Sequence, residues 1–183
     1  MTSTFNHKVF CGQTFIGGNY ALLNTTTFTP NPDYYGALLW QRLMGKRVLP
    51  ATHQGSPFMR VYSHCAKQKP RVTLILINMA GSTSFNVTLF NDENLYLKSV
   101  NQDSASNSGF KGYQPREEYH LMPKDGNIRS DVALLNGTPL LLTESLDILA
   151  MSPELVDASS AITVAADSIV FVTIRDFHAL ACA

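Results

Sequence analysis

The chain has 183 residues, of which 45% are hydrophobic and 15% charged, and its 14 basic residues balance 14 acidic ones. This composition is typical of a globular protein with one core and excludes a disordered or fibrous chain. The neutral balance also excludes a broad basic surface for nucleic acid, so local groups would have to meet any acidic sugar. Small basic groupings occur at residues 46–47 and 67–71, and both are interpreted as solvated loop charge.

The start of the chain carries no recognisable export signal. Residues 1–7 lack the basic region and the apolar run of a signal peptide. The best apolar stretch, residues 72–77, has the length of a strand rather than of a membrane span. Taken literally, these observations predict a chain that stays in the cytosol.

Residues 10–45 are expected to form one β/α unit. A short apolar run at 14–16 is followed by Gly17 and Gly18, which suits a strand end where the backbone turns sharply or approaches a ligand. Asn31 and the proline after it predict the start of an amphipathic helix, and Gly45 predicts its end. One such unit cannot bury both its faces. It either docks on the following β domain or is the last piece of a larger α/β domain, and the second interpretation is preferred.

After Gly45 the hydrophobic period changes to that of strands. Alternation is clearest at residues 84–90, where Asn86 falls on the polar face, and residues 72–77 are apolar on both faces, as in a central strand. Turn signals separate the short runs, Asn136-Gly137 among them. Residues 101–112 are expected to form a long exposed loop, and 143–160 to cross the surface. The pattern predicts an antiparallel β-sandwich with strands at 58–64, 72–77, 84–90, 95–100, 119–122, 132–135 and 169–174.

Three cysteines and three glycosylation sequons bear on the cellular compartment. Cys65 and Cys182 flank strands of the same predicted sandwich, and their spacing alone does not decide between a disulfide and two buried thiols. Without any Cys-x-x-Cys pair, structural zinc has no support. The sequons, together with a disulfide, favour a secretory origin. They begin at Asn24, Asn86 and Asn136.

The sequence offers no catalytic pair of carboxylates. A retaining glycosidase needs two, roughly 5–5.5 Å apart. Glu117 and Glu118 are the only adjacent glutamates, and neighbours on a strand point to opposite faces. The other acidic candidates, in a predicted turn and in the irregular C-terminal stretch, have nothing near them to shape a pocket. No phosphate loop, serine-hydrolase motif, metal-ligand spacing or cofactor motif occurs, so no cofactor is expected.

Several linked segments resemble the heparanase-like β-glucuronidases of glycoside hydrolase family 79, and the plant branch is most similar. Residues 13–20 (QTFIGGNY) and 30–39 resemble the end of the catalytic barrel in that family. Residues 58–65 (FMRVYSHC) resemble its strand with the first cysteine of a C-terminal disulfide, and residues 171–183 resemble its ending with the second. The resemblance covers essentially the whole chain.

The resemblance implies a fold. Residues 1–45 would be the last strand and helix of a (β/α)₈ barrel whose remainder is absent, and residues 46–183 the β-sandwich. It also implies a disulfide between Cys65 and Cys182. Because barrel active sites lie at the carboxyl ends of the strands, Gly18, Asn19 and Tyr20 would face the substrate in the full-length protein. The family's acid/base and nucleophile glutamates lie on earlier barrel strands, so neither is carried over. Gly12 stands where the family usually has arginine.

The resemblance implies that the chain is the C-terminal fragment of an endo-β-glucuronidase. The parent enzyme would hydrolyse glucuronidic bonds in glycans with retention, and the fragment alone is expected to be inactive. Its partner would be a uronic-acid-containing glycan in the full-length protein. No nucleic acid is expected as a partner, and membrane association is expected only to the extent that the family shows it. A lone chain is expected to self-associate through the barrel-facing surface. The full-length family enters the secretory pathway. The alternative is a stand-alone carbohydrate-binding or interaction module. The position of the only tryptophan, Trp40, in the predicted helix argues against this alternative.

Overall fold

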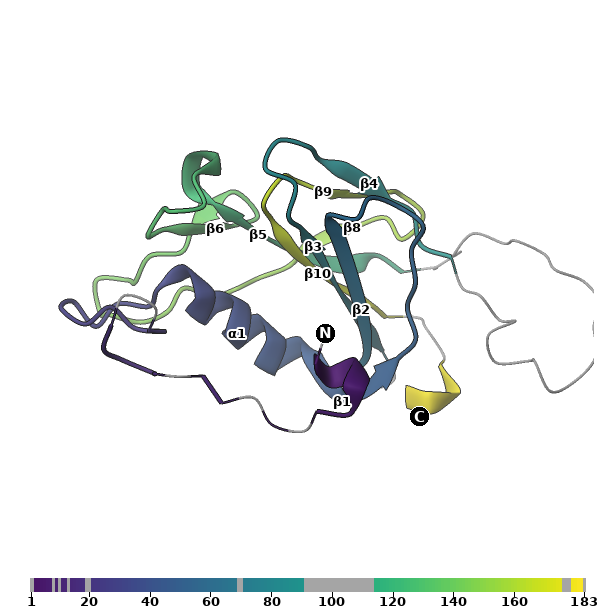
Figure 1. Ribbon diagram of the computed structural model, residues 1–183, viewed down its shortest axis with the longest axis horizontal. Coiled ribbons are helices and arrows are strands. Elements are labelled where there is room, and N and C mark those ends of the chain that lie inside the picture. Colours follow the sequence, from purple (N-terminus) through teal and green to yellow (C-terminus); the bar gives the residue numbers. More distant parts are fainter. Residues whose placement is uncertain are drawn as a thin grey trace, which may run out of the picture.

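Figure 1 shows the computed structural model of the chain, which describes residues 2–7, 9, 11–12, 14–18, 21–68, 71–90, 114–175 and 179–182. Its main feature is an antiparallel eight-stranded sheet. Seven strands follow one another in the order β1 (Met44–Leu49), β2 (Met59–Ala66), β3 (Val72–Asn78), β10 (Ile169–Ile174), β5 (Arg116–Pro123), β6 (Ala133–Leu135) and β7 (Thr138–Pro139).

The remaining elements are short, apart from one helix. The eighth strand, β8 (Glu154–Val156), pairs with the first half of β5. A second sheet consists of β4 (Phe85–Val87) and β9 (Ile162–Val164). The α-helix, α1, runs over Pro32–Leu43, and single 3-10 turns lie at η1 (Thr2–Phe5), η3 (Lys124–Gly126) and η4 (Leu180–Cys182). No helix in the described part of the chain is long and apolar enough to cross a bilayer.

Strand alternation places a hydrophobic cluster on each face of the large sheet. On one face, Ile75 and Phe171 pack with Leu39 of α1. On the other, Leu76 and Val172 pack against β4 and β9. Figure 1 shows this arrangement, with α1 below the sheet and the two-stranded sheet above it. The structure therefore confirms a mainly β, antiparallel fold. The assignment of residues 1–45 to a barrel and of 46–183 to a separate sandwich stays a prediction.

Several predicted strands differ from the observed ones. The run at 14–16 forms no strand; only a single bridge joins Ile16 to Leu23. The strand predicted at 84–90 is paired over Phe85–Val87 alone. The predicted strand 95–100 and loop 101–112 lie outside the described residues. β1, β7, β8 and β9 were not predicted, because β1 exposes three consecutive residues and the others have two or three residues each.

The end of α1 also differs from the prediction. The helix begins at Pro32 as expected, but its C-cap is Met44 in extended conformation, and Gly45 already belongs to β1. A Cβ atom at Gly45 would lie 2.4 Å from the backbone oxygen of Cys65. Glycine is therefore required at this position by the close approach of β2, and not by a left-handed helix cap.

Helix α1 is fixed to the sheet by polar bonds as well as by its apolar face. The Tyr35 hydroxyl donates to the carbonyl of Leu140, 3.1 Å away and buried. At the other end, the Leu43 carbonyl accepts from the backbone N–H of Lys67 at 2.9 Å and from the Thr73 hydroxyl at 3.4 Å. These donors satisfy a carbonyl that the helix end leaves without an intrahelical partner.

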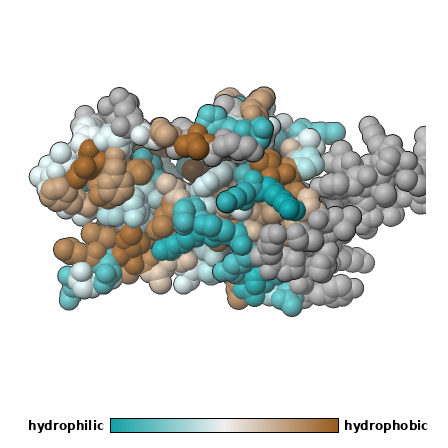
Figure 2. Space-filling model, turned by 90° about the horizontal axis from the view of Figure 1, so that it is seen from below, coloured by the Kyte–Doolittle hydropathy of each residue, from teal (hydrophilic) through white to brown (hydrophobic). Residues whose placement is uncertain are grey.

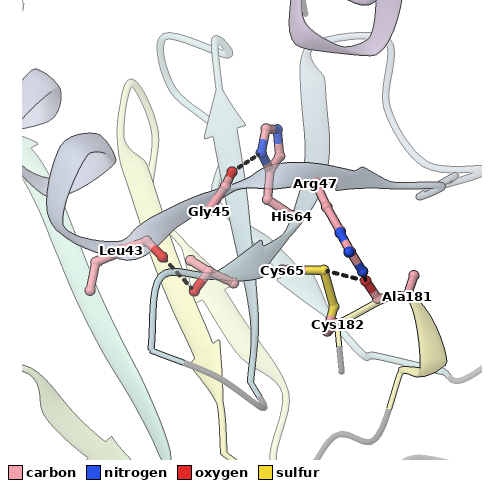
Figure 3. The surroundings of a disulfide bond; sticks show 8 residues. Leu43, Gly45, Arg47, His64, Cys65, Ala181 and Cys182 are labelled. Atoms are coloured by element: carbon pink, nitrogen blue, oxygen red, sulfur yellow. Dashed lines mark hydrogen bonds between the residues drawn. A yellow bond between two sulfur atoms is a disulfide. The ribbon is translucent and has the colours of Figure 1, made fainter.

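A disulfide joins Cys65 at the end of β2 to Cys182 in η4, across 117 residues (Figure 3). Both cysteines are buried, in a small cluster with Leu49 and Val72. Beside them, the Arg47 guanidinium donates to the carbonyl of Ala181 at 2.5 Å. This is the pair that the family resemblance implied. The third cysteine, Cys11, is free and exposed.

Apolar side chains remain exposed at one end of the molecule. Figure 2 shows apolar surface gathered on the left of the face seen from below, where the segments 14–30 and 140–150 lie. The exposed large side chains in these segments are Phe15, Ile16, Phe28, Leu141 and Leu146. Self-association through such a surface stays a prediction.

We expect the disulfide to be a main contributor to stability. Chain-entropy arguments give about 4–5 kcal/mol for a closed loop of this length, before strain is counted. Replacing both cysteines in a Cys65→Ser/Cys182→Ser variant should lower the free energy of unfolding by several kcal/mol, measured by urea denaturation. Cys11→Ser is the matched control and should change it by less than about 0.5 kcal/mol. Equal stability of the two variants would contradict the structural role of the bridge.

Candidate functional site

The glycine pair of the N-terminal segment adopts the backbone conformation that its sequence suggested. Gly17 and Gly18 have φ values of 102° and 83°, which other residues rarely adopt. The turn is held by the backbone N–H of Leu23, which donates to the carbonyl of Phe15 at 2.9 Å. Gly18 is exposed, whereas Asn19 and Tyr20 lie outside the described residues. A role of these three residues in substrate binding stays a prediction.

A wide cleft lies elsewhere, between the N-terminal segment and the sheet. It measures about 1400 Å³ and opens beside η1, α1 and β1. His64 lies in its wall, buried, with Nδ1 2.8 Å from the Gly45 carbonyl and Nε2 3.1 Å from the Ser3 hydroxyl. Trp40 stands edge-on to the same imidazole, with ring centroids 5.1 Å apart. None of the described residues lining this cleft is a carboxylate, so they do not supply the two carboxyl groups of a retaining glycosidase.

The adjacent glutamates Glu117 and Glu118 lie on β5 and point to opposite faces of the sheet, as the sequence predicted. Glu117 lies on the face covered by α1, where it accepts from Arg175. Glu118 lies on the face covered by β4 and β9, where it accepts from Arg116. Because the sheet separates the two carboxylates, they cannot flank one glycosidic bond.

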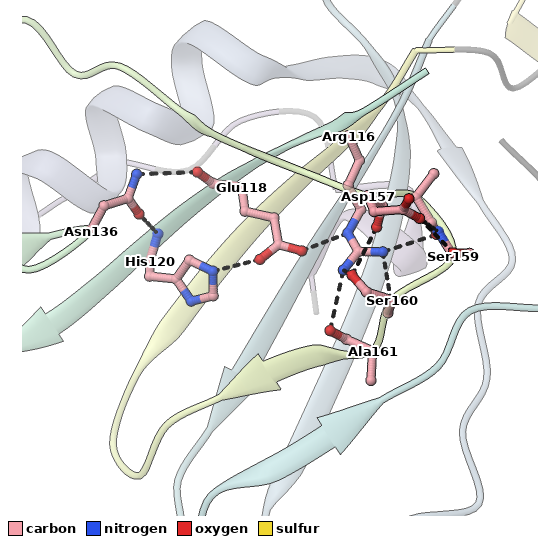
Figure 4. Close-up of polar contacts among 9 residues, drawn as sticks. Arg116, Glu118, His120, Asn136, Asp157, Ser159, Ser160 and Ala161 are labelled. Carbon is pink, nitrogen blue, oxygen red and sulfur yellow. Dashed lines mark hydrogen bonds and ion pairs between the residues drawn. The ribbon is translucent and has the colours of Figure 1, made fainter. Parts of the chain in front are cut away.

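Arg116, Glu118 and His120 form a buried polar network along one face of β5 (Figure 4). Arg116 is 1% exposed, and its Nε donates to Glu118 Oε1 at 2.5 Å. The other carboxylate oxygen of Glu118 lies 2.7 Å from His120 Nε2. Every charge in this network therefore has a partner, which a buried ion requires.

The rest of the Arg116 guanidinium holds the loop between β8 and β9. Its Nη1 donates to the carbonyls of Ala158 and Ser160, at 3.0 and 2.7 Å. Its Nη2 donates to the Ser160 hydroxyl at 3.2 Å and to the Ala161 carbonyl at 3.3 Å. This arginine thus fixes the segment that leads into the small sheet, which is a structural role. The spacing of Arg116, Glu118 and His120 at every second residue was the sequence signal for it.

The environment of Glu118 favours its ionised form. Burial by itself raises the pKa of this carboxyl group. The hydrogen bonds from His120 and Arg116, together with the charges of both partners, outweigh burial and hold the pKa below its ordinary value of 4.5. Glu118 is therefore a structural anion, whereas a catalytic acid needs a raised pKa.

The three sequon asparagines have different surroundings. Asn24 and Asn86 are exposed, and only their side-chain oxygens accept hydrogen bonds, from Thr26, Thr27 and Thr163. Asn136 begins the turn between β6 and β7, with φ 48°. Its side-chain nitrogen donates to the carbonyls of Glu118 and Ser152, both at 3.3 Å. A glycan on Asn136 would replace one of these donors, so Asn24 and Asn86 offer freer sites. Glycosylation at all three stays a prediction.

Comparison with known proteins identifies the family. The chain is 41% identical over its whole length to Heparanase-like protein 1 of Arabidopsis thaliana, of which it covers 36%, and 43% identical to Heparanase-like protein 3 of the same plant, of which it covers 35%. The chain belongs to the heparanase-like proteins. It corresponds to their C-terminal portion and spans about a third of the length of these relatives.

More distant comparisons add less. Baicalin-beta-D-glucuronidase of Scutellaria baicalensis is 41% identical over 90% of the heparanase-like chain, which covers 28% of that enzyme. Among solved structures, a GH30 endoxylanase from Clostridium papyrosolvens matches 84% of the chain and 30% of its own length at 13% identity, with a TM-score of 0.45. That likeness is too low to support an argument. No protein-family model matches the chain. Among the described residues, no three His, Cys, Asp or Glu side chains form a group able to hold a metal ion.

Removing Arg116 should destabilise this heparanase-like chain strongly. An Arg116→Leu variant leaves Glu118 buried beside His120 alone, and breaking a buried ion pair from one side costs about 3–5 kcal/mol. Urea denaturation measures the change. The matched control is Arg129→Leu, which removes an exposed arginine after η3 and should cost less than about 0.5 kcal/mol. A second variant, Arg116→Met/Glu118→Leu, removes both charges and should recover part of the loss; similar stability of Arg116→Leu and wild type would contradict the role of the network.

The Glu118 carboxyl should also make stability depend on acid pH. Because its pKa is lower in the folded chain, its contribution is complete above pH 4.5 and is lost as the pH falls through the folded-state pKa. The unfolding free energy should therefore fall more steeply below pH 4.5 in wild type than in Glu118→Gln. Asp131→Asn is the control, because it removes an exposed carboxylate outside this network. Identical pH profiles for wild type and Glu118→Gln would refute the assignment.

Proposed function

We propose that this chain is the non-catalytic C-terminal portion of a heparanase-like β-glucuronidase, which hydrolyses glucuronidic bonds in glycans with retention. The names of its relatives, at 40–43% identity over 90–100% of the chain, support the glycosidase class. In this proposal the large sheet supports a catalytic domain, and the acid/base and nucleophile come from outside residues 1–183. A uronic-acid-containing glycan is the partner of the longer protein.

One observation carries the claim that the chain alone is inactive. Glu117 and Glu118 are adjacent in sequence and both are buried, but the sheet separates their carboxylates and each accepts hydrogen bonds from an arginine. A retaining mechanism needs two carboxyl groups about 5–5.5 Å apart on the two sides of one bond, one of them with a raised pKa. Glu118 has a lowered pKa, which does not suit the acid, and its side chain is buried away from any bound sugar.

Within the longer protein, the turn at Gly17 and Gly18 is proposed to face the substrate. Both glycines have positive φ values, as in a sharp turn, and Gly18 is exposed. Backbone N–H groups at such a turn suit the carboxylate of a uronic acid, because successive N–H groups in turn conformations bind anions. Asn19 and Tyr20 follow this turn in sequence and belong to the same proposal.

The alternative of an independent carbohydrate-binding module finds less support. Sugar-binding modules use exposed, flat aromatic faces, whereas Trp40 is 37% exposed and packs edge-on against His64 at the base of α1. The aromatic ring is thus part of the contact between the helix and the sheet.

The purified chain should not hydrolyse an aryl β-glucuronide above the uncatalysed rate. The measurement is release of the aryl group over a range from pH 4 to pH 8, with baicalin-beta-D-glucuronidase as the active reference enzyme. Turnover by the chain that disappears in a Glu117→Gln or Glu118→Gln variant of normal fold would overturn the proposal, because the activity would then reside in this sheet. Turnover that neither variant affects, and that a second purification does not remove, would overturn the claim of inactivity as well.

A further inference from the structure

Three arginines from distant segments converge at one end of the large sheet. Arg42 lies in the last turn of α1, Arg71 immediately precedes β3, and Arg175 immediately follows β10. Arg71 and Arg175 both approach the same oxygen atom, Oε1 of Glu117. Arg175 donates to it from Nε at 2.9 Å and from Nη2 at 2.5 Å, and Arg71 Nη1 lies 3.7 Å away. The antiparallel pairing of β3 with β10 produces this convergence, since the start of one strand lies beside the end of the other.

Arg42 reaches the same neighbourhood through Tyr119, which follows Glu117 on the same face of β5. Burial, and then the Glu117 carboxylate, raise the pKa of the Tyr119 phenol, while the charges of Arg175, Arg42 and Arg71 act against the rise. The end of α1 lies beside the start of β3, because the Leu43 carbonyl accepts from the backbone N–H of Lys67 at 2.9 Å and from the Thr73 hydroxyl at 3.4 Å. A fourth cation, Lys67, donates to the carbonyl of Gln41 in the last turn of α1 at 2.5 Å.

The positive charge of this cluster exceeds its described negative charge. Two arginines approach one carboxylate and a third lies in the last turn of α1, although the chain as a whole has no net charge. Glu117 is 8% exposed, whereas the side chains of Arg71 and Arg175 are 28% and 32% exposed and Arg42 is exposed. Each guanidinium has five N–H donors, and Glu117 engages at most two of them on either arginine. Arg71 Nη1 also donates to Gln68 Oε1 at 3.1 Å. Glu117 and Gln68 thus orient the two partly exposed guanidinium groups without engaging all their donors.

We propose that Arg42, Arg71 and Arg175 form an anion-binding site for the acidic groups, carboxylate or sulfate, of a glycan chain. The planar fork of a guanidinium matches both groups in bidentate geometry, and bidentate pairs are the stronger hydrogen bonds. Like charges held this close also repel each other, and one buried carboxylate relieves only part of that repulsion. The proposal rests on the proposed function for the choice of a glycan. It assigns to Arg71 a role, whereas the sequence alone had left the basic grouping around it as solvated loop charge.

The test is the affinity of the full chain for labelled oligosaccharides, measured by fluorescence anisotropy at low salt. The probes are a sulfated heparin oligosaccharide and an unsulfated hyaluronan oligosaccharide of the same length, which separate sulfate from carboxylate recognition. The variant is Arg42→Gln/Arg71→Gln, which spares the close Arg175–Glu117 pair and should retain the wild-type melting temperature. Its matched control is Lys124→Gln/Arg129→Gln, which removes two exposed charges beyond the opposite end of β5.

We expect the Arg42→Gln/Arg71→Gln variant to bind at least one probe roughly tenfold more weakly than wild type, because charged hydrogen bonds are lost. The control should stay within about twofold of wild type. Equal losses in both variants, or no binding by wild type, would overturn the site. A single-stranded DNA oligonucleotide of the same charge that binds as tightly as the glycans would overturn the choice of ligand. Hydrolysis of aryl glucuronides is a separate assay, so failure here leaves the proposed function standing and failure there leaves this site standing.

Discussion

Strand β10 holds the molecule together, because it pairs with β3 on one side and with β5 on the other. All six of its residues pair with β3 and five of them pair with β5, although roughly a hundred residues separate β10 from β3 in sequence. Its side chains alternate between the two cores, with Phe171 toward α1 and the fully buried Val170 and Val172 toward the small sheet. Burying each such side chain contributes about 1.5–3 kcal/mol. Both layers that cover the large sheet depend on this alternation.

The same alternation determines what the charged residues of β5 can do. Two neighbouring glutamates in a flexible loop would be free to meet on one ligand, but on a strand between two covered faces each must find its own cation. Glu118 finds Arg116 and His120 within the protein, and every contact of this network is internal. Glu117 lies near the end of the sheet, so its arginine partners are partly exposed. Glu118 is therefore part of the core, whereas Glu117 lies beneath a cluster of arginines at the surface.

The sequence predicted those parts of the fold whose signal is local. The continuous apolar run at 169–174 and the Asn136-Gly137 turn specify β10 and the β6–β7 hairpin without tertiary information. β5 was predicted too short, because the charged residues 116–118 are unlike a buried strand until their partners are known. β1 was not predicted, because its residues 46–48 are all exposed and show no alternation. Its pairing with β2 depends on the close approach at Gly45, which the sequence alone does not show.

The candidate sites follow the same division. The glycine turn was visible in the sequence, since positive φ values and glycine go together. Spacing left the pairing of Cys65 with Cys182 undecided, and only the family resemblance favoured it, because nothing local records which strands meet. The cluster of Arg42, Arg71 and Arg175 could not be predicted at all. Its members come from three elements far apart in the chain, and only the strand order brings them together.

The disulfide has a topological consequence for how the chain responds to proteases. Cys65 and Cys182 enclose almost two thirds of the residues in one covalent ring, whose closing point lies beside the last residue. A single backbone cut anywhere between them would open the ring without releasing a fragment, so the two pieces would travel as one molecule until reduced. Cleavage of the backbone within this ring and release of a fragment are thus separate events. The fragment is released only where the surroundings reduce the disulfide.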